Sequence, residues 1–247
     1  MDFITAKLND RQKEAVLTGD GPVLVLAGAG SGKTRVLTSR VAYLVMEKEV
    51  YPSSILAITF TNKAAREINS RVGKMMGGGM WFPLIGTVHS MFLKMLRMYP
   101  ESIGYSSGFA IYDQDDQKVL VKDCLKELNY DTKLLPPKMV VHNISRAKDE
   151  LIDAAKFNDI NASDYKMSIV GKVYALYQKR MVENNAMDFG DLIANAVRML
   201  RENENIRNYF QNAFRHILID EYQDTNTAQY ELAHILAEKH GNIFVVG

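Results

Sequence analysis

The octapeptide Ala27-Gly28-Ala29-Gly30-Ser31-Gly32-Lys33-Thr34 constrains the fold of this chain more than any other feature. It follows the apolar run at residues 23–26 and opens a stretch with helical periodicity, and this order of strand, loop and helix is the setting of a phosphate-binding P-loop. Small residues let successive backbone N–H groups surround phosphate oxygens, and the helix N-terminus adds partial positive charge. We therefore predict that Lys33 reaches the β and γ phosphates of a nucleotide and that the Thr34 hydroxyl holds Mg²⁺.

The motif departs from the strict pattern at its first position, where Ala27 stands in place of glycine. Alanine is small enough for the same turn, so the departure weakens the prediction little. The alternative is a glycine-rich turn that binds nothing. The Gly-Lys-Thr sequence between a strand and a helix disfavours that alternative.

Four further apolar runs, at residues 55–58, 84–88, 217–219 and 243–246, resemble the one at 23–26. Continuous Val, Ile and Leu without polar alternation predict parallel strands covered on both faces. Between the first two runs, apolar residues recur at helical spacing from Val36 to Val45. Strand, helix and strand in this order predict a parallel α/β sheet.

The middle of the chain, from residue 99 to residue 207, shows helical patterns and no convincing strand. Asp113 is a candidate N-cap, Pro136-Pro137 breaks the chain, and two further helices are expected at 168–184 and 189–200. We therefore predict an all-helical insertion at 99–207 inside an α/β domain formed by residues 1–98 and 208–247.

Composition narrows the class of protein but not its ligand. Thirty basic and 29 acidic residues give a net charge of +1, so a nucleic-acid site would have to be a local groove. No apolar run reaches the roughly 18 residues of a membrane span, and the polar N-terminus does not resemble a signal peptide. Cys124 is the only cysteine, which excludes intrachain disulfides and fits the cytoplasm, where we expect the protein.

A P-loop needs an acidic partner at the C-terminal end of a neighbouring strand, because ligands gather at that edge of open α/β sheets. Asp220 and Glu221 directly follow the apolar run at 217–219. Asp220 would hold the metal, directly or through water, and Glu221 would act as the general base toward the attacking water. The alternative is that the two acidic residues are only an exposed strand end without a function. The presence of the P-loop disfavours this alternative.

These motifs belong to a larger set that resembles the superfamily 1 helicases of the UvrD, Rep and PcrA type. The run Asp220-Glu221-Tyr222-Gln223-Asp224-Thr225-Asn226 resembles their motif II. The other segments that resemble family motifs, in chain order, are Leu8-Asn9-Asp10-Arg11-Gln12 (Q motif), Thr59-Phe60-Thr61-Asn62-Lys63-Ala64-Ala65 (motif Ia), Gly86-Thr87-Val88-His89-Ser90 (motif Ib) and Asp188-Phe189-Gly190-Asp191-Leu192, which closes the helical insertion.

The resemblance implies a fold and a nucleotide site. The α/β part would be the first RecA-like domain, called 1A, and the insertion would be domain 1B. Gln12 would hydrogen-bond adenine, Arg35 would contact the nucleotide, and Gln223 would sense the γ-phosphate. The nucleotide-binding set implied is Gln12, Ala27, Gly28, Ala29, Gly30, Ser31, Gly32, Lys33, Thr34 and Arg35. The catalytic set is Lys33, Asp220, Glu221 and Gln223, with Thr34 and Asp220 as metal ligands.

The resemblance also implies contacts with single-stranded DNA and with junctions between single and double strands. The residues concerned are Phe60, Thr61, Asn62, Lys63, His89 and Ser90. An aromatic ring such as Phe60 stacks on any base, and the polar side chains suit phosphates or sugars. Phe60 could instead be a core residue, and His89 a structural histidine. Basic residues of the insertion, such as Lys138 and Lys148, could touch duplex DNA or simply face solvent.

Together these features predict an ATP-driven, Mg²⁺-dependent DNA translocase that unwinds duplexes, with 3′→5′ polarity if it follows the family. We expect the chain to stop before motif III and before the domain that carries the arginine fingers. The helicase subunit of a helicase–nuclease complex and a nucleotide-dependent DNA-binding module without turnover remain alternatives. The pathway, whether repair or replication, stays open.

Overall fold

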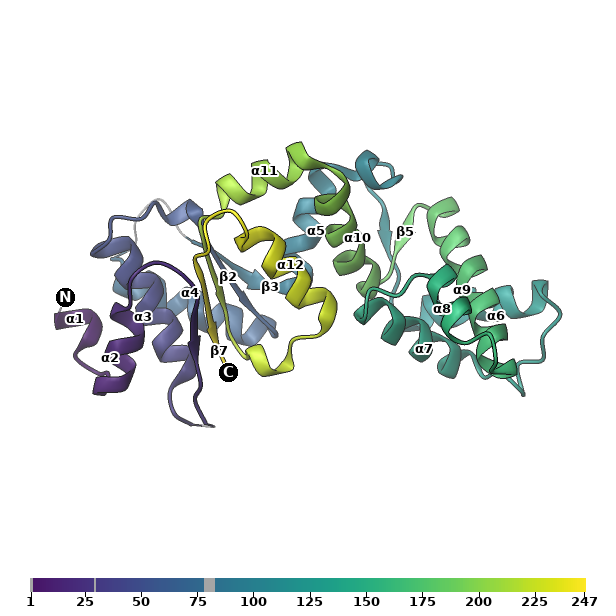
Figure 1. Cartoon of the computed structure of the whole chain (residues 1–247), viewed down its shortest axis with the longest axis horizontal. Helices are drawn as coiled ribbons and strands as arrows, with labels where there is room; N and C mark the ends of the chain where they lie inside the picture. The colour runs from purple at the N-terminus through teal and green to yellow at the C-terminus, as the bar shows by residue number, and fades with distance from the viewer. Residues whose placement is uncertain (1, 29, 78–82) are drawn as a thin grey trace. The chain divides into compact units, whose positions relative to one another are not determined.

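The computed structural model describes residues 2–28, 30–77 and 83–247, in which the chain forms two compact units (Figure 1). The first comprises Met1–Met91, Asn203–Thr225 and Leu232–Gly247, and the second comprises Phe92–Glu202 and Asn226–Glu231. The second unit therefore begins before residue 99 and ends before residue 207, and it also takes in a short segment after residue 225. Two of the four boundaries fall within helices, one in α5 (Val88–Met98) and one in α12 (Thr227–Ala237).

The first unit is built from a five-stranded sheet and its covering helices. Its elements in chain order are α1 (Asp2–Thr5), α2 (Asp10–Leu17), β1 (Val23–Val25), α3 (Lys33–Met46), η1 (Pro52–Ser54), β2 (Ile55–Thr59), α4 (Asn62–Met75), β3 (Leu84–Thr87), the start of α5 (Val88–Met98), α11 (Glu204–Ala213), β6 (His216–Ile219), η3 (Tyr222–Asp224), the end of α12 (Thr227–Ala237) and β7 (Ile243–Val246).

All strands of this sheet run parallel, in the order β1-β7-β6-β2-β3. Each of the five apolar runs forms a strand, which confirms the predicted parallel α/β sheet. Strand β6 lies in the middle of the order, next to β2, with Ile219 opposite Ile58. Since the strands are parallel, their carboxyl ends meet at one edge, and the predicted motifs follow these ends.

Helices cover both faces of the central strands. Alternate residues, such as Ala57 of β2 and Leu218 of β6, share one core with α2, α3 and α4, and their neighbours Leu56 and Ile217 are buried on the opposite face. Strand β1 is the exception to the predicted coverage, because Leu24 is 59% exposed. Strand β1 is an edge strand that pairs only with β7, and for it the prediction of coverage on both faces is wrong.

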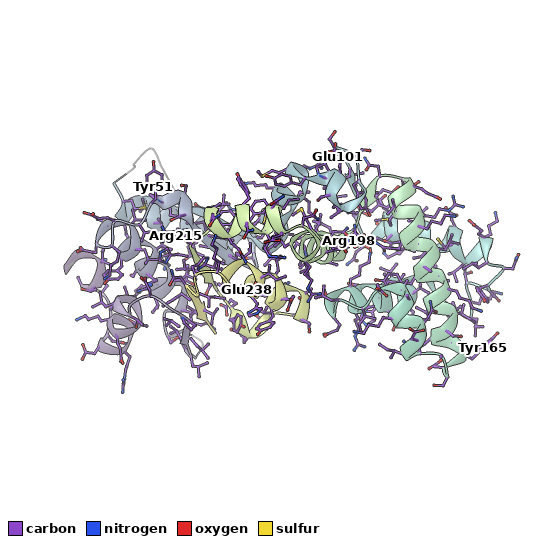
Figure 2. The ribbon with its side chains drawn as sticks, turned by 45° about the horizontal axis from the view of Figure 1, so that its top comes forward. Tyr51, Glu101, Tyr165, Arg198, Arg215 and Glu238 are labelled. Carbon is purple, nitrogen blue, oxygen red and sulfur yellow. The ribbon has the colours of Figure 1, made fainter. Side chains whose placement is uncertain are left out.

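The second unit is mainly helical, with two short strands. Its elements are the end of α5, η2 (Pro100–Ile103), β4 (Ala110–Ile111), α6 (Gln114–Glu127), α7 (Pro137–Asp149), α8 (Ala154–Ile160), α9 (Tyr165–Glu183), β5 (Ala186–Met187), α10 (Phe189–Glu202) and the start of α12. Asp113 caps α6 as predicted, since its side chain accepts from the backbone N–H groups of Asp115 and Asp116. Figure 2 shows Arg198 of α10, which donates to the Ile103 carbonyl.

The prediction that residues 99–207 are all-helical is wrong in one detail. Strands β4 and β5 form a parallel pair, with Ala110 opposite Ala186 and Ile111 opposite Met187. Two residues are too few to produce a period-2 pattern, so sequence periodicity could not reveal either strand. The pair brings the segment before α6 against the segment after α9.

A buried ionic cluster lies where α7, α9 and α10 meet. The Lys148 ammonium lies 2.6 Å from Asp188 Oδ2 and 2.8 Å from Asp191 Oδ1. Tyr177 donates to Asp188, and Gln178 donates to Asp191. Burial alone would lower the pKa of Lys148, but the two carboxylates raise it well above its usual value. Lys148 therefore neither faces solvent nor is available to DNA, contrary to both interpretations from the sequence.

Candidate functional site

The carboxyl edge of the sheet in the first unit carries the predicted site residues. The P-loop follows β1, Phe60 follows β2, His89 and Ser90 follow β3 in the first turn of α5, and Asp220 follows β6. Parallel register places these strand ends side by side, because Ile58 is opposite Ile219 and Thr59 is opposite Thr87. The topology thus brings segments as far apart in sequence as residues 27 and 221 to the same edge of the sheet.

The P-loop backbone depends on glycine at two positions. Gly30 and Gly32 have φ angles of 75° and 88°, in the left-handed region that favours glycine. A Cβ at Gly32 would also lie 3.1 Å from the Gln12 side-chain nitrogen. Helix α3 begins directly afterwards at Lys33 and has no side-chain cap, which leaves its N-terminus suited to an anion. Ala29 lies outside the described residues.

The first residue of the P-loop is held by the end of β7. The Ala27 backbone N–H donates to the Gly247 carbonyl over 2.7 Å, and the Gly247 N–H donates to Val25 over 3.0 Å. Within the loop, the Ser31 N–H donates to the Gly28 carbonyl. The hydrogen bonds between β1 and β7 therefore continue into the first residue of the P-loop.

Lys33 and Glu221 form an ion pair, with 3.0 Å between Nζ and Oε2. Gln223 also donates to the same Glu221 oxygen, over 2.6 Å. Hydrogen bonds from Gln223 and from Lys33 hold the pKa of Glu221 below its usual range. Two of the residues predicted as catalytic, Lys33 and Gln223, thus contact a third, Glu221, directly.

The fourth, Asp220, lies beside them but is almost fully buried, at 1% exposure. Its carboxylate accepts hydrogen bonds from the Glu221 backbone N–H and from the Thr34 hydroxyl. Burial raises the pKa of Asp220, and the like charge of Glu221 raises it further. The two predicted metal ligands, Thr34 and Asp220, are therefore in contact.

Gln12 lies beside the P-loop, where it has two structural tasks. Its side-chain oxygen accepts from the Asn9 N–H and completes the capping box that starts α2. Its side-chain nitrogen donates to the Ser31 carbonyl over 2.7 Å. Arg35 is exposed and donates to the Lys7 carbonyl over 3.4 Å. It lines a cavity of about 330 Å³ between α1, α3 and α4.

The candidate DNA contacts after β2 are accessible. Phe60 is partly buried, while Thr61, Asn62 and Lys63 are exposed. Thr61 also has a structural task, because its hydroxyl oxygen caps α4 by accepting from the Ala64 N–H.

The candidates after β3 are less accessible. The Ser90 hydroxyl donates to the Thr87 carbonyl and accepts from the Thr87 N–H, so it fixes the start of α5. His89 is partly buried, and this burial lowers its pKa. A neutral imidazole suits a hydrogen bond better than an ion pair with phosphate.

Comparison with known proteins identifies the family. Residues 8–247 match the model of the UvrD/REP helicase N-terminal domain. The chain belongs to this family. It is 46% identical to the ATP-dependent DNA helicase PcrA of Staphylococcus aureus over all of this chain and 34% of that protein. It is 47% identical to the PcrA of Bacillus subtilis over 97% of this chain and 32% of that protein. The chain thus spans about a third of the length of these relatives.

The oxygen donors of this UvrD/REP-family site fit Mg²⁺. Thr34 and Asp220 supply a hydroxyl and a carboxylate, the hard ligands that Mg²⁺ prefers. Among the described residues, no cluster of three or more His, Cys, Asp or Glu side chains could hold a metal. Proteins commonly hold Mg²⁺ by one or two side chains together with substrate phosphates. Within the same residues, no helix is long and apolar enough to cross a membrane.

Proposed function

We propose that this chain is the ATP-binding part of a DNA helicase that moves along single-stranded DNA, with its first unit as domain 1A and its second as domain 1B. The observation that carries the proposal is the contact set of Lys33, Thr34, Asp220, Glu221 and Gln223 at the end of a P-loop. The family match supports the same assignment. We further propose 3′→5′ movement, action at junctions between single and double strands, and a cytoplasmic location.

The geometry gives each residue a role. The N-terminus of α3 and the P-loop N–H groups would bind the phosphates, and Lys33 would leave Glu221 to pair with the β and γ phosphates. Thr34 and Asp220 would hold Mg²⁺, which neutralises phosphate charge when it is bound.

Glu221 would then accept the proton of a water molecule whose oxygen bonds to the γ-phosphorus, while the bond from that phosphorus to the bridging oxygen breaks. Gln223, already bonded to Glu221, would lie close to the γ-phosphate and report its presence. The Glu221 carboxylate therefore changes partner from Lys33 to water during the cycle.

Gln12 is the proposed contact with the adenine base, and Arg35 is a proposed contact with the nucleotide. Gln12 would exchange the Ser31 carbonyl for adenine, so base recognition and the shape of the P-loop would depend on each other. DNA would lie at the same sheet edge, against Phe60, Asn62 and Lys63, with Thr61, His89 and Ser90 alongside. The site would support helicase action if ATP binding and hydrolysis change how tightly this edge of the sheet binds a DNA strand.

Calorimetric titration of the chain with Mg²⁺ and a non-hydrolysable ATP analogue tests the nucleotide site. We expect measurable binding that Lys33→Ala abolishes, because this change deletes the charge facing the β and γ phosphates. Lys122→Ala, on the exposed face of α6, is the matched control and should leave affinity unchanged. Equal affinity in the Lys33→Ala and unsubstituted chains would contradict the proposal.

A further inference from the structure

The boundary between the two units falls inside the acidic motif. Residues up to Thr225 belong to the first unit and Asn226–Glu231 to the second. Only η3 and Thr225 separate Glu221 from Asn226. Five residues reach at most about 18 Å when fully extended, and the turn of η3 shortens this reach. Along the chain, the proposed general base is thus five residues from the start of a segment of the second unit.

Asn226 uses both ends of its amide at this boundary. Its oxygen accepts from the Gln229 N–H over 2.9 Å and caps α12. Its nitrogen donates to Asp149 Oδ1 over 2.7 Å, and Asp149 is the last residue of α7. One side chain therefore starts the helix that follows the motif and fastens it to another helix of the second unit.

The receiving end of this bond is firmly held. Asp149 follows Lys148, whose ammonium is buried between Asp188 and Asp191 of the ionic cluster. Burial raises the pKa of Asp149, as do the nearby charges of Glu150 and Asp188. A donated hydrogen bond is therefore the interaction that this partly buried carboxylate needs.

Two polar atoms without partners flank the same point. Within the part of the chain that the structure describes, Thr225 Oγ1 and Gln229 Oε1 are buried and have no hydrogen-bond partner. Unpaired buried polar atoms are costly, so native proteins carry few of them. These two atoms lie on either side of Asn226 in the chain. We infer that other interactions hold this segment in place despite the free-energy cost of the unpaired atoms.

We propose that Asn226, through its hydrogen bond to Asp149, is a positioning residue for ATP hydrolysis. The bond fixes the far end of the segment that carries Glu221 and Gln223, so that these side chains keep the orientation that hydrolysis requires. The inference rests on the proposed ATPase function. Loss of the bond should lower kcat and leave nucleotide affinity intact, because the P-loop is untouched.

The decisive experiment exchanges the two partners in the whole protein. Asn226→Asp keeps a good helix cap but cannot donate, and it sets two carboxylates against each other. We expect DNA-stimulated kcat to fall about 10- to 100-fold, the effect of losing a hydrogen bond to a charged group, with KM for ATP unchanged. Adding Asp149→Asn to this variant exchanges the two side chains, so that the amide at position 149 donates and the carboxylate at position 226 accepts. The double variant should have a kcat within about 3-fold of that of the unsubstituted protein.

Asn226→Ser provides a second variant, because serine caps helices well but is too short to reach Asp149. Asp153→Asn, a change at the N-cap of α8, is the matched control and should leave kcat unchanged. If kcat is unaffected in both Asn226 variants, or if the double exchange folds normally without restoring kcat, the inference is wrong. If the whole protein without substitutions fails to hydrolyse ATP in the presence of DNA, the proposed function itself is wrong.

Discussion

At the scale of single residues, Glu221 has the most informative backbone. Its φ of 53° lies in the left-handed region, where residues other than glycine are uncommon. Such conformations cost about 1–3 kcal/mol and persist where surrounding structure enforces them, often at functional sites. The strained turn follows a buried aspartate and directs the Glu221 carboxylate to Lys33. The strained backbone of Glu221 therefore occurs together with the ion pair between Glu221 and Lys33, which the proposed mechanism must break.

Glu221→Gln separates water activation from nucleotide binding. Glutamine keeps the shape of the side chain but cannot take a proton, so we expect kcat of the whole protein to fall about 10²–10⁴-fold. Nucleotide affinity should stay close to normal, because Lys33 pairs with phosphate in the bound state. Steady-state ATPase assays and nucleotide titration measure the two effects. A kcat within a few-fold of the unsubstituted protein would exclude Glu221 as the base.

Phe60→Ala tests the stacking role. The ring is only partly buried, so we expect weaker binding of single-stranded DNA by about 1–3 kcal/mol and little loss of stability. Fluorescence anisotropy and a thermal melt report the two quantities. Phe92→Ala is the contrasting control, because Phe92 is 1% exposed and its loss should destabilise the fold by about 3–5 kcal/mol. A melt like that of Phe92→Ala with normal DNA affinity would make Phe60 a core residue.

At the scale of elements, long apolar runs were informative and short ones were not. Strands such as β2, with all five residues buried, are visible in the sequence because burial on both faces demands continuous apolar residues. The edge exposure of β1 depends on which strand lies beside it, and no local pattern encodes that. The pair β4–β5 is too short for periodicity. The P-loop and motif II residues are predicted from sequence because phosphate binding demands particular residues at fixed spacing.

Lys148 was misread because its partners are distant in sequence. Asp188 and Asp191 lie 40 or more positions further along, and a lone lysine in a helical stretch gives no sign of burial. The one available signal was the pair of aspartates three residues apart, which cap α10 reciprocally. Such a cap indicates a helix start but not a buried cation beside it.

Lys148→Met should destabilise the second unit strongly. Two buried carboxylates would lose their cation, and breaking a buried pair from one side costs about 3–5 kcal/mol. Urea unfolding of the chain measures the change, with Lys122→Met as an exposed control expected within about 0.5 kcal/mol of the unsubstituted chain. A loss below about 1 kcal/mol for Lys148→Met would show that the cluster contributes little to stability.

At the scale of the whole molecule, we predict that residues 1–247 alone hydrolyse ATP slowly or not at all, without stimulation by DNA. Charge on the transferred γ-phosphoryl group must be met from several sides, and an arginine finger contributes about 10³–10⁵-fold in related sites. The chain spans about a third of the length of its PcrA relatives. A steady-state ATPase assay, with and without single-stranded DNA, measures this.

Lys33→Ala in the same assay reveals any contaminating ATPase. Robust DNA-stimulated turnover that disappears in this variant would mean that residues 1–247 hold a complete catalytic site, contrary to the prediction. Slow turnover that survives in the variant would come from another enzyme.

The hydrogen bond from Ala27 to Gly247 has a practical consequence for work with this piece of chain. A polypeptide that stops at residue 247 carries its terminal carboxylate on the residue that holds the start of the P-loop. That extra anion would repel the phosphates of a nucleotide, and a fused tag at this end would emerge beside the same loop. Amidation of the C-terminus removes the charge. Comparing amidated and free-acid chains would show how much this terminal charge lowers the nucleotide affinity.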